Sequence, residues 1–218
     1  MIKLLIYDLD GTLIDSRLDI AYAVNWTLKE LGRGPLPVEQ VSSFVGNGVK
    51  NLMQQALKAS SPSSLPPLER SIKLFRRRYG EHLLDQTRLY PSVKKVLEFF
   101  KDLNQAVVTN KPEDFTREIL RGLGIDSYFG RVIGGDQGFP KKPAPEPVLE
   151  LLGHFEVRPE ETLLIGDSQT DVETARNAGV KTVAVTYGFG KRSELESAQP
   201  DILLNDLEEL TRCPLLKK

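Results

Sequence analysis

The sequence has almost no cysteine, no excess of charge of either sign and no long apolar run. A single cysteine, Cys213, cannot form an intrachain disulfide and has no second thiol beside which to hold zinc, which is typical of a reducing compartment. The 29 Lys and Arg residues balance 30 Asp and Glu residues. A net charge of -1 excludes the broad cationic surface that non-specific nucleic-acid or membrane binding requires.

Apolar stretches stay short throughout the chain. The first, Leu4 to Tyr7, is too short for the apolar region of a secretion signal, and no later stretch approaches the length of a membrane span. We therefore expect a cytoplasmic protein with no nucleic-acid or membrane partner. The sequence leaves open whether it is a monomer or a homodimer.

The apolar stretches alternate with helical patterns, which predicts an α/β fold with a doubly wound parallel sheet. About 95 residues separate the first two predicted strands, far more than one strand-to-helix connection needs, so we expect an inserted α-helical domain there. The predicted core is 1–14 and 88–218, and the predicted insertion is 15–87. The predicted strands are 4–7, 106–109, 132–134, 162–165 and 182–185. In the insertion, one predicted helix runs from near Ser16 to Gly32, and two more span 48–59 and 68–84. Residues 60–67 are predicted to form the loop between the last two helices.

Polar side chains follow several of these strands. Asp8 and Asp10 come directly after the first strand, where alternation along an extended chain places both on the same side. The carboxyl ends of parallel strands form the usual ligand crevice of such a sheet. An Asx-turn at a polar strand end is the alternative interpretation.

The other candidates are Thr109 and Asn110 after the second strand, Lys142 in a Lys-Pro pair, and Asp167 with Asp171 after the fourth strand. Carboxylates can hold Mg²⁺, hydroxyl and backbone N–H groups can hold phosphate oxygens, and a lysine can offset the remaining charge. Each motif alone is weak, because Thr109–Asn110 and Asp167–Ser168 are also typical helix N-caps and Lys142 is also typical of a solvated loop.

In this order, the motifs resemble the four motifs of the haloacid dehalogenase-like hydrolase superfamily, over essentially the whole chain. The matching segments are 8–12, 109–110, 142 and 166–171. The resemblance implies a Rossmann-like core and a mobile helical cap domain in the 15–87 interval. It also implies that Asp8 is the nucleophile, which forms an aspartyl-phosphate, and that Asp10 is the general acid/base.

The same resemblance implies the remaining roles. Mg²⁺ would be held by the Asp8 carboxylate, the Asp10 backbone carbonyl and Asp167, supported by Asp171. Lys142 would offset negative charge, and Thr109 would contact the phosphoryl group. The implied substrate-binding residues of the core are Thr12 and Asn110, the latter through its backbone.

The superfamily contains dehalogenases as well as phosphatases, and Asp10 separates them. A departing alkoxide needs a proton whereas a halide does not, so a general acid at this position favours a phosphatase.

The loop Phe44–Val49 resembles the cap loop of phosphoglycolate phosphatases and offers Gly46, Asn47 and Gly48 as candidate substrate-binding residues. A plain turn between helices is the alternative. The resemblance implies a Mg²⁺-dependent phosphomonoesterase acting on a small phosphorylated metabolite, 2-phosphoglycolate, to give glycolate and phosphate. Other phosphatases of the superfamily remain open: a pyrophosphatase, a nucleotidase, or a sugar-phosphate phosphatase or mutase. From other classes, a phospho-acceptor signalling module and a non-catalytic scaffold remain open.

Overall fold

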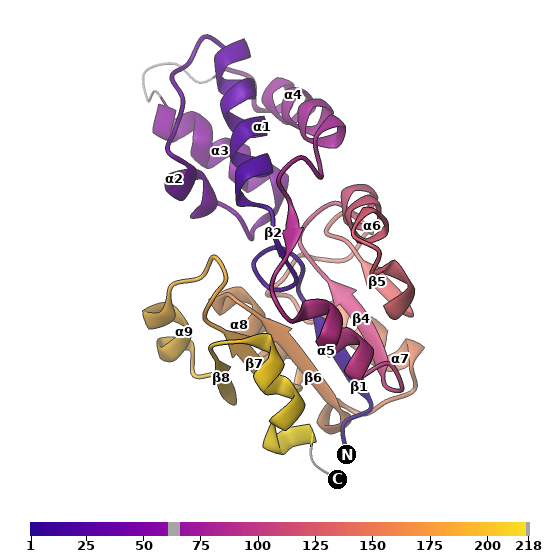
Figure 1. Ribbon diagram of the computed structural model, residues 1–218. Helices are drawn as coiled ribbons and strands as arrows, with labels where there is room; N and C mark the ends of the chain where they lie inside the picture. The colour runs from indigo at the N-terminus through magenta and orange to yellow at the C-terminus, as the bar shows by residue number, and fades with distance from the viewer. Residues whose placement is uncertain (61–65, 217–218) are drawn as a thin grey trace. The chain divides into compact units, whose positions relative to one another are not determined.

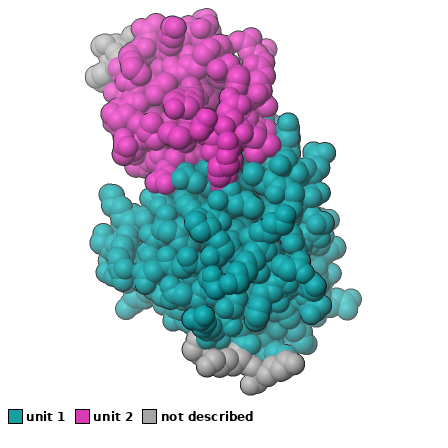
Figure 2. Space-filling model, in the orientation of Figure 1, with its two compact units in different colours: residues 1–15, 89–218 teal, residues 16–88 magenta. Residues whose placement is uncertain are grey.

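The computed structural model describes residues 1–60 and 66–216, and the chain divides into two compact units (Figure 2). Unit 1 contains Met1–Asp15 and Leu89–Lys218, and unit 2 contains Ser16–Arg88. The divisions fall one residue after the boundaries expected from the sequence. The two connections between the units pair as a two-stranded sheet of β2 (Ile14–Asp15) and β3 (Arg88–Leu89).

Within the described part of the chain, unit 1 holds a six-stranded sheet in which every pairing is parallel (Figure 1). The strand order is β5-β4-β1-β6-β7-β8, which confirms the predicted doubly wound α/β fold. Five strands match the predicted ones to within two residues at each end, whereas β8 was not predicted. The strands are β1 (Leu4–Tyr7), β4 (Asn104–Val108), β5 (Arg131–Ile133), β6 (Thr162–Gly166), β7 (Lys181–Val185) and β8 (Ile202–Leu204).

Helices cover both faces of this sheet. On one face, Leu4 and Ile6 of β1 share a buried cluster with side chains from α7 and α8. On the other, Gln105 of β4 donates a hydrogen bond to the Leu97 carbonyl of α5. The helices of unit 1 are α5 (Val93–Phe99), α6 (Glu113–Gly122), α7 (Glu146–His154), α8 (Gln169–Ala178) and α9 (Arg192–Ala198), with 3₁₀ turns at Asp126–Tyr128, Pro159–Glu161, Leu207–Arg212 and Pro214–Leu216.

The order of the strands reverses direction at β1. From β1 the chain passes to β4 and β5 on one side, then crosses to β6 on the other side of β1 and continues to β7 and β8. In open α/β sheets, this switch point leaves a crevice in which ligands bind. The residues that follow β1, β4 and β6 therefore meet where a ligand site is expected.

Unit 2 is helical, and its first helix packs against each of the other three. The two ends of the unit are joined by the buried Asp19 carboxylate of α1, which accepts hydrogen bonds from the backbone N–H groups of Gln86 and Thr87 and from the Thr87 hydroxyl. The helices are α1 (Arg17–Glu30), α2 (Val38–Ser42), α3 (Gly48–Ser60) and α4 (Leu68–Glu81).

The helical predictions for unit 2 are largely confirmed. Three helices lie where they were expected, with α4 ending three residues early, and Gly32 adopts the left-handed φ of +69° expected after α1. The five-residue α2 was not predicted. Of the predicted loop 60–67, residues 61–65 lie outside the described residues. No helix among the described residues is both long enough and apolar enough to cross a membrane.

Candidate active site

Three aspartates meet at the carboxyl ends of β1 and β6. Asp8 follows β1, Asp167 follows β6, and Asp171 lies in the first turn of α8. One carboxylate oxygen of each lies within 4.8 Å of the others. The pairing of the strands sets this arrangement, because the ladder continues past β1 with the Asp8 N–H donating to the Ile165 carbonyl at 2.9 Å.

Lys142 lies against two of these aspartates. Its Nζ is 2.8 Å from Asp8 Oδ1 and 2.6 Å from Asp171 Oδ1, and only 4% of its side chain is exposed. The neighbouring Lys141 is exposed. The Lys142–Pro143 peptide bond is cis.

The Asn110 side chain fixes the backbone of Lys142. Its Nδ2 donates to the Lys142 carbonyl at 3.0 Å, and its Oδ1 accepts from the Lys142 N–H at 2.9 Å. Asn110 therefore connects the loop after β4 to the loop that carries the lysine. This pair of bonds could not be inferred from sequence, because 32 positions separate the two residues.

Burial and charge perturb the ionisation of the cluster. Burial raises the pKa of Asp8 to about 6, although the Lys142 ammonium opposes that shift. Burial, together with the charges of Asp171 and Asp8, raises the pKa of Asp167 to about 8. Burial lowers the pKa of Lys142, but its ion pairs with Asp171 and Asp8 outweigh burial and leave that pKa above its ordinary value.

The chemistry of this cluster fits a hard divalent cation. Three buried carboxylates face a single lysine, so anionic charge remains uncompensated, and burial together with that charge raises the pKa of Asp167. Carboxylate oxygens are the donors that Mg²⁺ prefers. Asp8 and Asp167 would hold the metal, and Asp171 lies in the same cluster.

Two loops enclose the Asp167 carboxylate. The Thr12 hydroxyl donates to Asp167 Oδ1 at 3.1 Å, and the backbone N–H groups of Phe189 and Gly190 donate to Oδ2 at 2.7 and 3.3 Å. The hydroxyl of Thr12, a predicted substrate-binding residue, is thus directed at Asp167. Tyr187 completes the enclosure by donating to the Thr12 carbonyl at 2.7 Å.

Glycine is required in this enclosure. A Cβ at Gly188 would lie 2.3 Å from Asp167 Oδ2, and one at Gly11, where φ is +89°, would lie 2.1 Å from the same atom. Residues 187–190 were not among the site residues predicted from sequence. The available signal was a Gly-x-Gly pair, Gly188 and Gly190, that begins three residues after the end of a predicted strand.

Replacing Gly188 by alanine is expected to displace Asp167 and to lower the free energy of unfolding by about 1–3 kcal/mol, the usual cost of overpacking. The rise in melting temperature on adding Mg²⁺ should also shrink, because Asp167 would no longer be held in place. Thermal unfolding with Mg²⁺ and with EDTA measures both effects. Gly153→Ala is the matched control, since Gly153 lies in α7 with no neighbour within 4 Å of an added Cβ and should be neutral or stabilising. Equal behaviour of the two variants would contradict this role for the 187–190 loop.

Asp10 has a different partner from Asp8. Lys111, at the end of the loop after β4, places its Nζ 2.9 and 3.1 Å from the two Asp10 carboxylate oxygens. The nearby Thr109 is buried, and its Oγ1 accepts from the Lys111 N–H at 3.2 Å. The Asp10 carboxylate is thus paired with a lysine, and the predicted contact of Asp10 with metal involves only its backbone carbonyl.

The N-cap interpretations have different outcomes at the two strand ends. Helix α6 begins at Glu113 with Pro112 at its N-cap, so capping by Thr109–Asn110 is wrong. Ser168 does cap α8: its side chain accepts from the Asp171 N–H, and Asp171 accepts from the Ser168 N–H. This N-cap holds Asp171 in the aspartate cluster. Capping of α8 and a place in the proposed site are therefore compatible at this strand end.

Gly46, Asn47 and Gly48 belong to unit 2, where they form the turn that opens α3. Gly46 and Gly48 have φ values of +112° and +80°, a backbone conformation that favours glycine. This turn is a structural requirement of the unit. Substrate binding by these residues remains a prediction.

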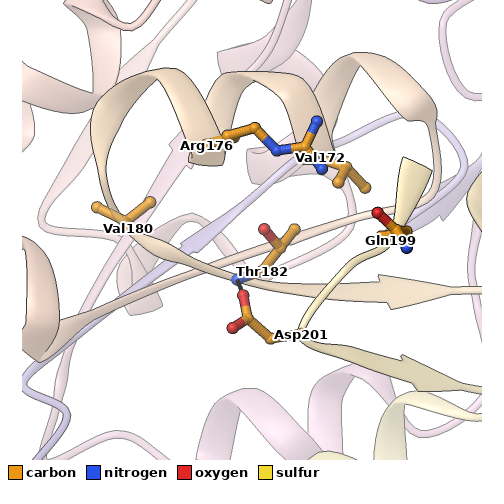
Figure 3. A pocket seen from close by; sticks show the side chains of 6 residues that line it. All are labelled: Val172, Arg176, Val180, Thr182, Gln199 and Asp201. Carbon is orange, nitrogen blue, oxygen red and sulfur yellow. Dashed lines mark hydrogen bonds between the residues drawn. The ribbon is translucent and has the colours of Figure 1, made fainter.

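A cavity of about 250 Å³ lies elsewhere in unit 1, between α8, β7 and the end of α9 (Figure 3). Its charged side chains are already engaged, since Arg176 donates to the Ala198 carbonyl and Asp201 accepts from the Thr182 N–H. The cavity holds none of the predicted site residues.

Comparison with known proteins gives a consistent result. Residues 5–185 match the haloacid dehalogenase-like hydrolase family. The chain is 38% identical to a phosphoglycolate phosphatase of Nitrosospira multiformis, covering 97% of this chain and 95% of the relative, and 37% identical to one of Aquifex aeolicus, covering 96% and 95%. It superposes with a TM-score of 0.93, at 34% identity and 97% coverage of both chains, on a crystal structure described as a predicted phosphoglycolate phosphatase from Haemophilus somnus 129pt. The chain therefore belongs to the haloacid dehalogenase-like hydrolases, as a phosphatase of that family.

Proposed function

We propose that the protein is a Mg²⁺-dependent phosphomonoesterase that hydrolyses 2-phosphoglycolate, or a similarly small phosphate ester, through an aspartyl-phosphate on Asp8. The observation that carries the proposal is the position of Asp8: its carboxylate is buried beside Asp167 and Asp171 and ion-paired to Lys142 at 2.8 Å. The narrower substrate rests on the names of the full-length relatives.

Asp8 would act as the nucleophile. One of its carboxylate oxygens attacks phosphorus, and the bond from phosphorus to the ester oxygen breaks. A pKa of about 6 leaves this carboxylate mostly ionised above neutral pH, while burial keeps it poorly solvated and reactive. Lys142 offsets negative charge beside the attacking oxygen.

Asp10 would transfer the protons. It would enter the first step with its carboxyl group protonated, give that proton to the departing alkoxide, and then take one from the water that attacks the aspartyl-phosphate, releasing phosphate and restoring Asp8. The Thr109 hydroxyl and the Asn110 backbone, both at the end of β4, would contact the phosphoryl oxygens. Mg²⁺, held by Asp8 and Asp167, would supply positive charge to the phosphoryl group as charge shifts during transfer.

Unit 2 would act as the cap domain that limits which esters reach the core. Its loop residues Gly46, Asn47 and Gly48 would supply backbone N–H groups to a small anion. This part of the proposal rests on the loop sequence and on the positive φ values of Gly46 and Gly48.

The direct test is phosphate release from 2-phosphoglycolate beside a panel of small phosphomonoesters, pyrophosphate and nucleotides, each with Mg²⁺ and with EDTA. We expect metal-dependent turnover with kcat/KM at least about tenfold higher for 2-phosphoglycolate than for the next ester, because that ratio measures discrimination. A tenfold preference for another phosphomonoester would contradict 2-phosphoglycolate as the substrate, but the protein would still be a phosphomonoesterase. Release of one equivalent of glycolate without phosphate, with the phosphoryl group remaining on the protein, would indicate a phospho-acceptor module instead.

A further inference from the structure

The core contains a second buried lysine that the phosphoryl-transfer steps do not use. Among the described residues, Lys111 and Lys142 are the buried lysines, and no arginine is buried. Lys142 is engaged by Asp8 and Asp171. Lys111 lies on the Asp10 side, with 5% of its side chain exposed.

Burying a lysine ammonium is costly unless an anion accompanies it. Asp10 supplies that anion here, with its oxygens 2.9 and 3.1 Å from Lys111 Nζ. In the proposed reaction, however, Asp10 is the group that meets the leaving oxygen of the ester. The Lys111 ammonium is therefore hydrogen-bonded directly to the side chain that contacts the leaving group.

The chemistry of the proposed substrate matches this arrangement. In 2-phosphoglycolate, the carbon that bears the leaving oxygen also bears a carboxylate. When Asp10 contacts that oxygen, the carboxylate comes within reach of a cation that is itself in contact with Asp10. A lysine ammonium is compact and carries three rotatable donors, so it can contact Asp10 and a second anion together.

Resting on the proposed function, we propose that Lys111 binds the carboxylate of the substrate and so determines specificity for an anionic leaving group. Lys142 then serves the phosphoryl side of the site and Lys111 the leaving-group side. The division follows from the fold, since Lys111 is brought in by β4 and Lys142 by the loop that precedes α7.

The test compares 2-phosphoglycolate with ethyl phosphate, in which a methyl group replaces the carboxylate. The variant is Lys111→Met, which keeps the length of the apolar stem and removes the charge. Hydrogen bonds to charged groups are among the stronger ones, so we expect the preference for 2-phosphoglycolate over ethyl phosphate, as a ratio of kcat/KM values, to fall about 30- to 100-fold. The loss should appear mainly in KM, and Lys111→Arg should restore part of the preference.

The controls separate binding from other roles. Lys141→Met removes an exposed lysine of the same unit and should leave the preference unchanged. If Lys111→Met does not fold, Lys111→Gln, whose amide can still donate to Asp10, replaces it. An equal fall for both esters would show that Lys111 only positions Asp10, which overturns the assignment.

The two proposals fail in different ways. A wild-type protein that prefers 2-phosphoglycolate, with a Lys111→Met variant that keeps that preference, contradicts only the assignment of Lys111. A wild-type protein with no preference for the carboxylate-bearing ester overturns the assignment of Lys111 and the proposed substrate together, because there is then no carboxylate recognition to assign, whereas metal-dependent turnover of other esters would still support a phosphomonoesterase.

Discussion

Replacing Asp8 by asparagine is expected to lower kcat/KM by at least about 10⁴-fold while the protein stays folded. An amide cannot form the acyl-phosphate that a carboxylate forms, so covalent transfer through residue 8 ends. Phosphate release with saturating Mg²⁺ measures the loss. The comparison requires wild-type protein purified in the same way, because a trace of wild-type enzyme would set the lower limit of detection.

The fold should survive this substitution because asparagine has nearly the same shape as aspartate. It also removes a buried carboxylate whose pKa burial raises to about 6, so one of three neighbouring anions disappears. We expect the melting temperature in EDTA to stay the same or rise. Turnover within about tenfold of wild type would show that Asp8 is not the nucleophile.

Replacing Lys142 by methionine is expected to lower the free energy of unfolding in EDTA by about 3–5 kcal/mol near neutral pH, the cost of leaving buried charges without their partner. The ammonium is 2.8 Å from Asp8 and 2.6 Å from Asp171, and its removal leaves three carboxylates in the buried cluster with no lysine beside them. Activity should fall with stability, since the same ammonium offsets the charge on Asp8.

The destabilisation by Lys142→Met should grow as pH rises. A carboxyl pKa raised by folding means that the folded protein holds its proton more tightly, so stability declines as pH rises from the ordinary value of 3.8 through the folded pKa. In wild type, the folded pKa of Asp8 is about 6, and Lys142 holds it below the value that burial alone would give. Without the lysine, that pKa rises further and the loss of stability extends to higher pH.

Urea unfolding of both proteins in EDTA, from about pH 5 to about pH 8, measures this dependence. The difference between wild type and Lys142→Met should be smallest at the acidic end, where protonation neutralises Asp8 in both. Lys141→Met, at the exposed neighbouring position, should stay within about 0.5 kcal/mol of wild type throughout. A difference that does not change with pH would contradict the charge argument.

The strands predicted correctly from sequence are those that contain several consecutive buried apolar residues. All four residues of β1 are buried, and β6 is buried along its whole length, so each contains an unbroken apolar stretch, residues 4–7 in β1 and 163–165 in β6. The elements that were missed, β8 and α2, are three and five residues long, with partly exposed side chains. Such segments carry too few residues to show a period, and tertiary contacts determine their conformation.

The same distinction applies to the site. Asp8, Asp167 and Lys142 could be identified because each follows a recognisable strand or stands in a recognisable motif. The pairing of Asp10 with Lys111, and the bonds between Asn110 and Lys142, join residues 101 and 32 positions apart. The need for glycine around Asp167 likewise arises only from the close approach of that carboxylate, which the sequence does not show.

The sequence by itself determined the α/β class, the inserted helical segment and the set of acidic and basic groups, because period, apolar stretches and motif order are local properties of the chain. Only the tertiary structure decided which lysine accompanies which aspartate, since β1 lies between β4 and β6 and gathers residues that are distant in the sequence. Burial then decided their electrostatics: the same carboxyl group titrates near 4 in water, and here the pKa values of Asp8 and Asp167 rise to about 6 and about 8.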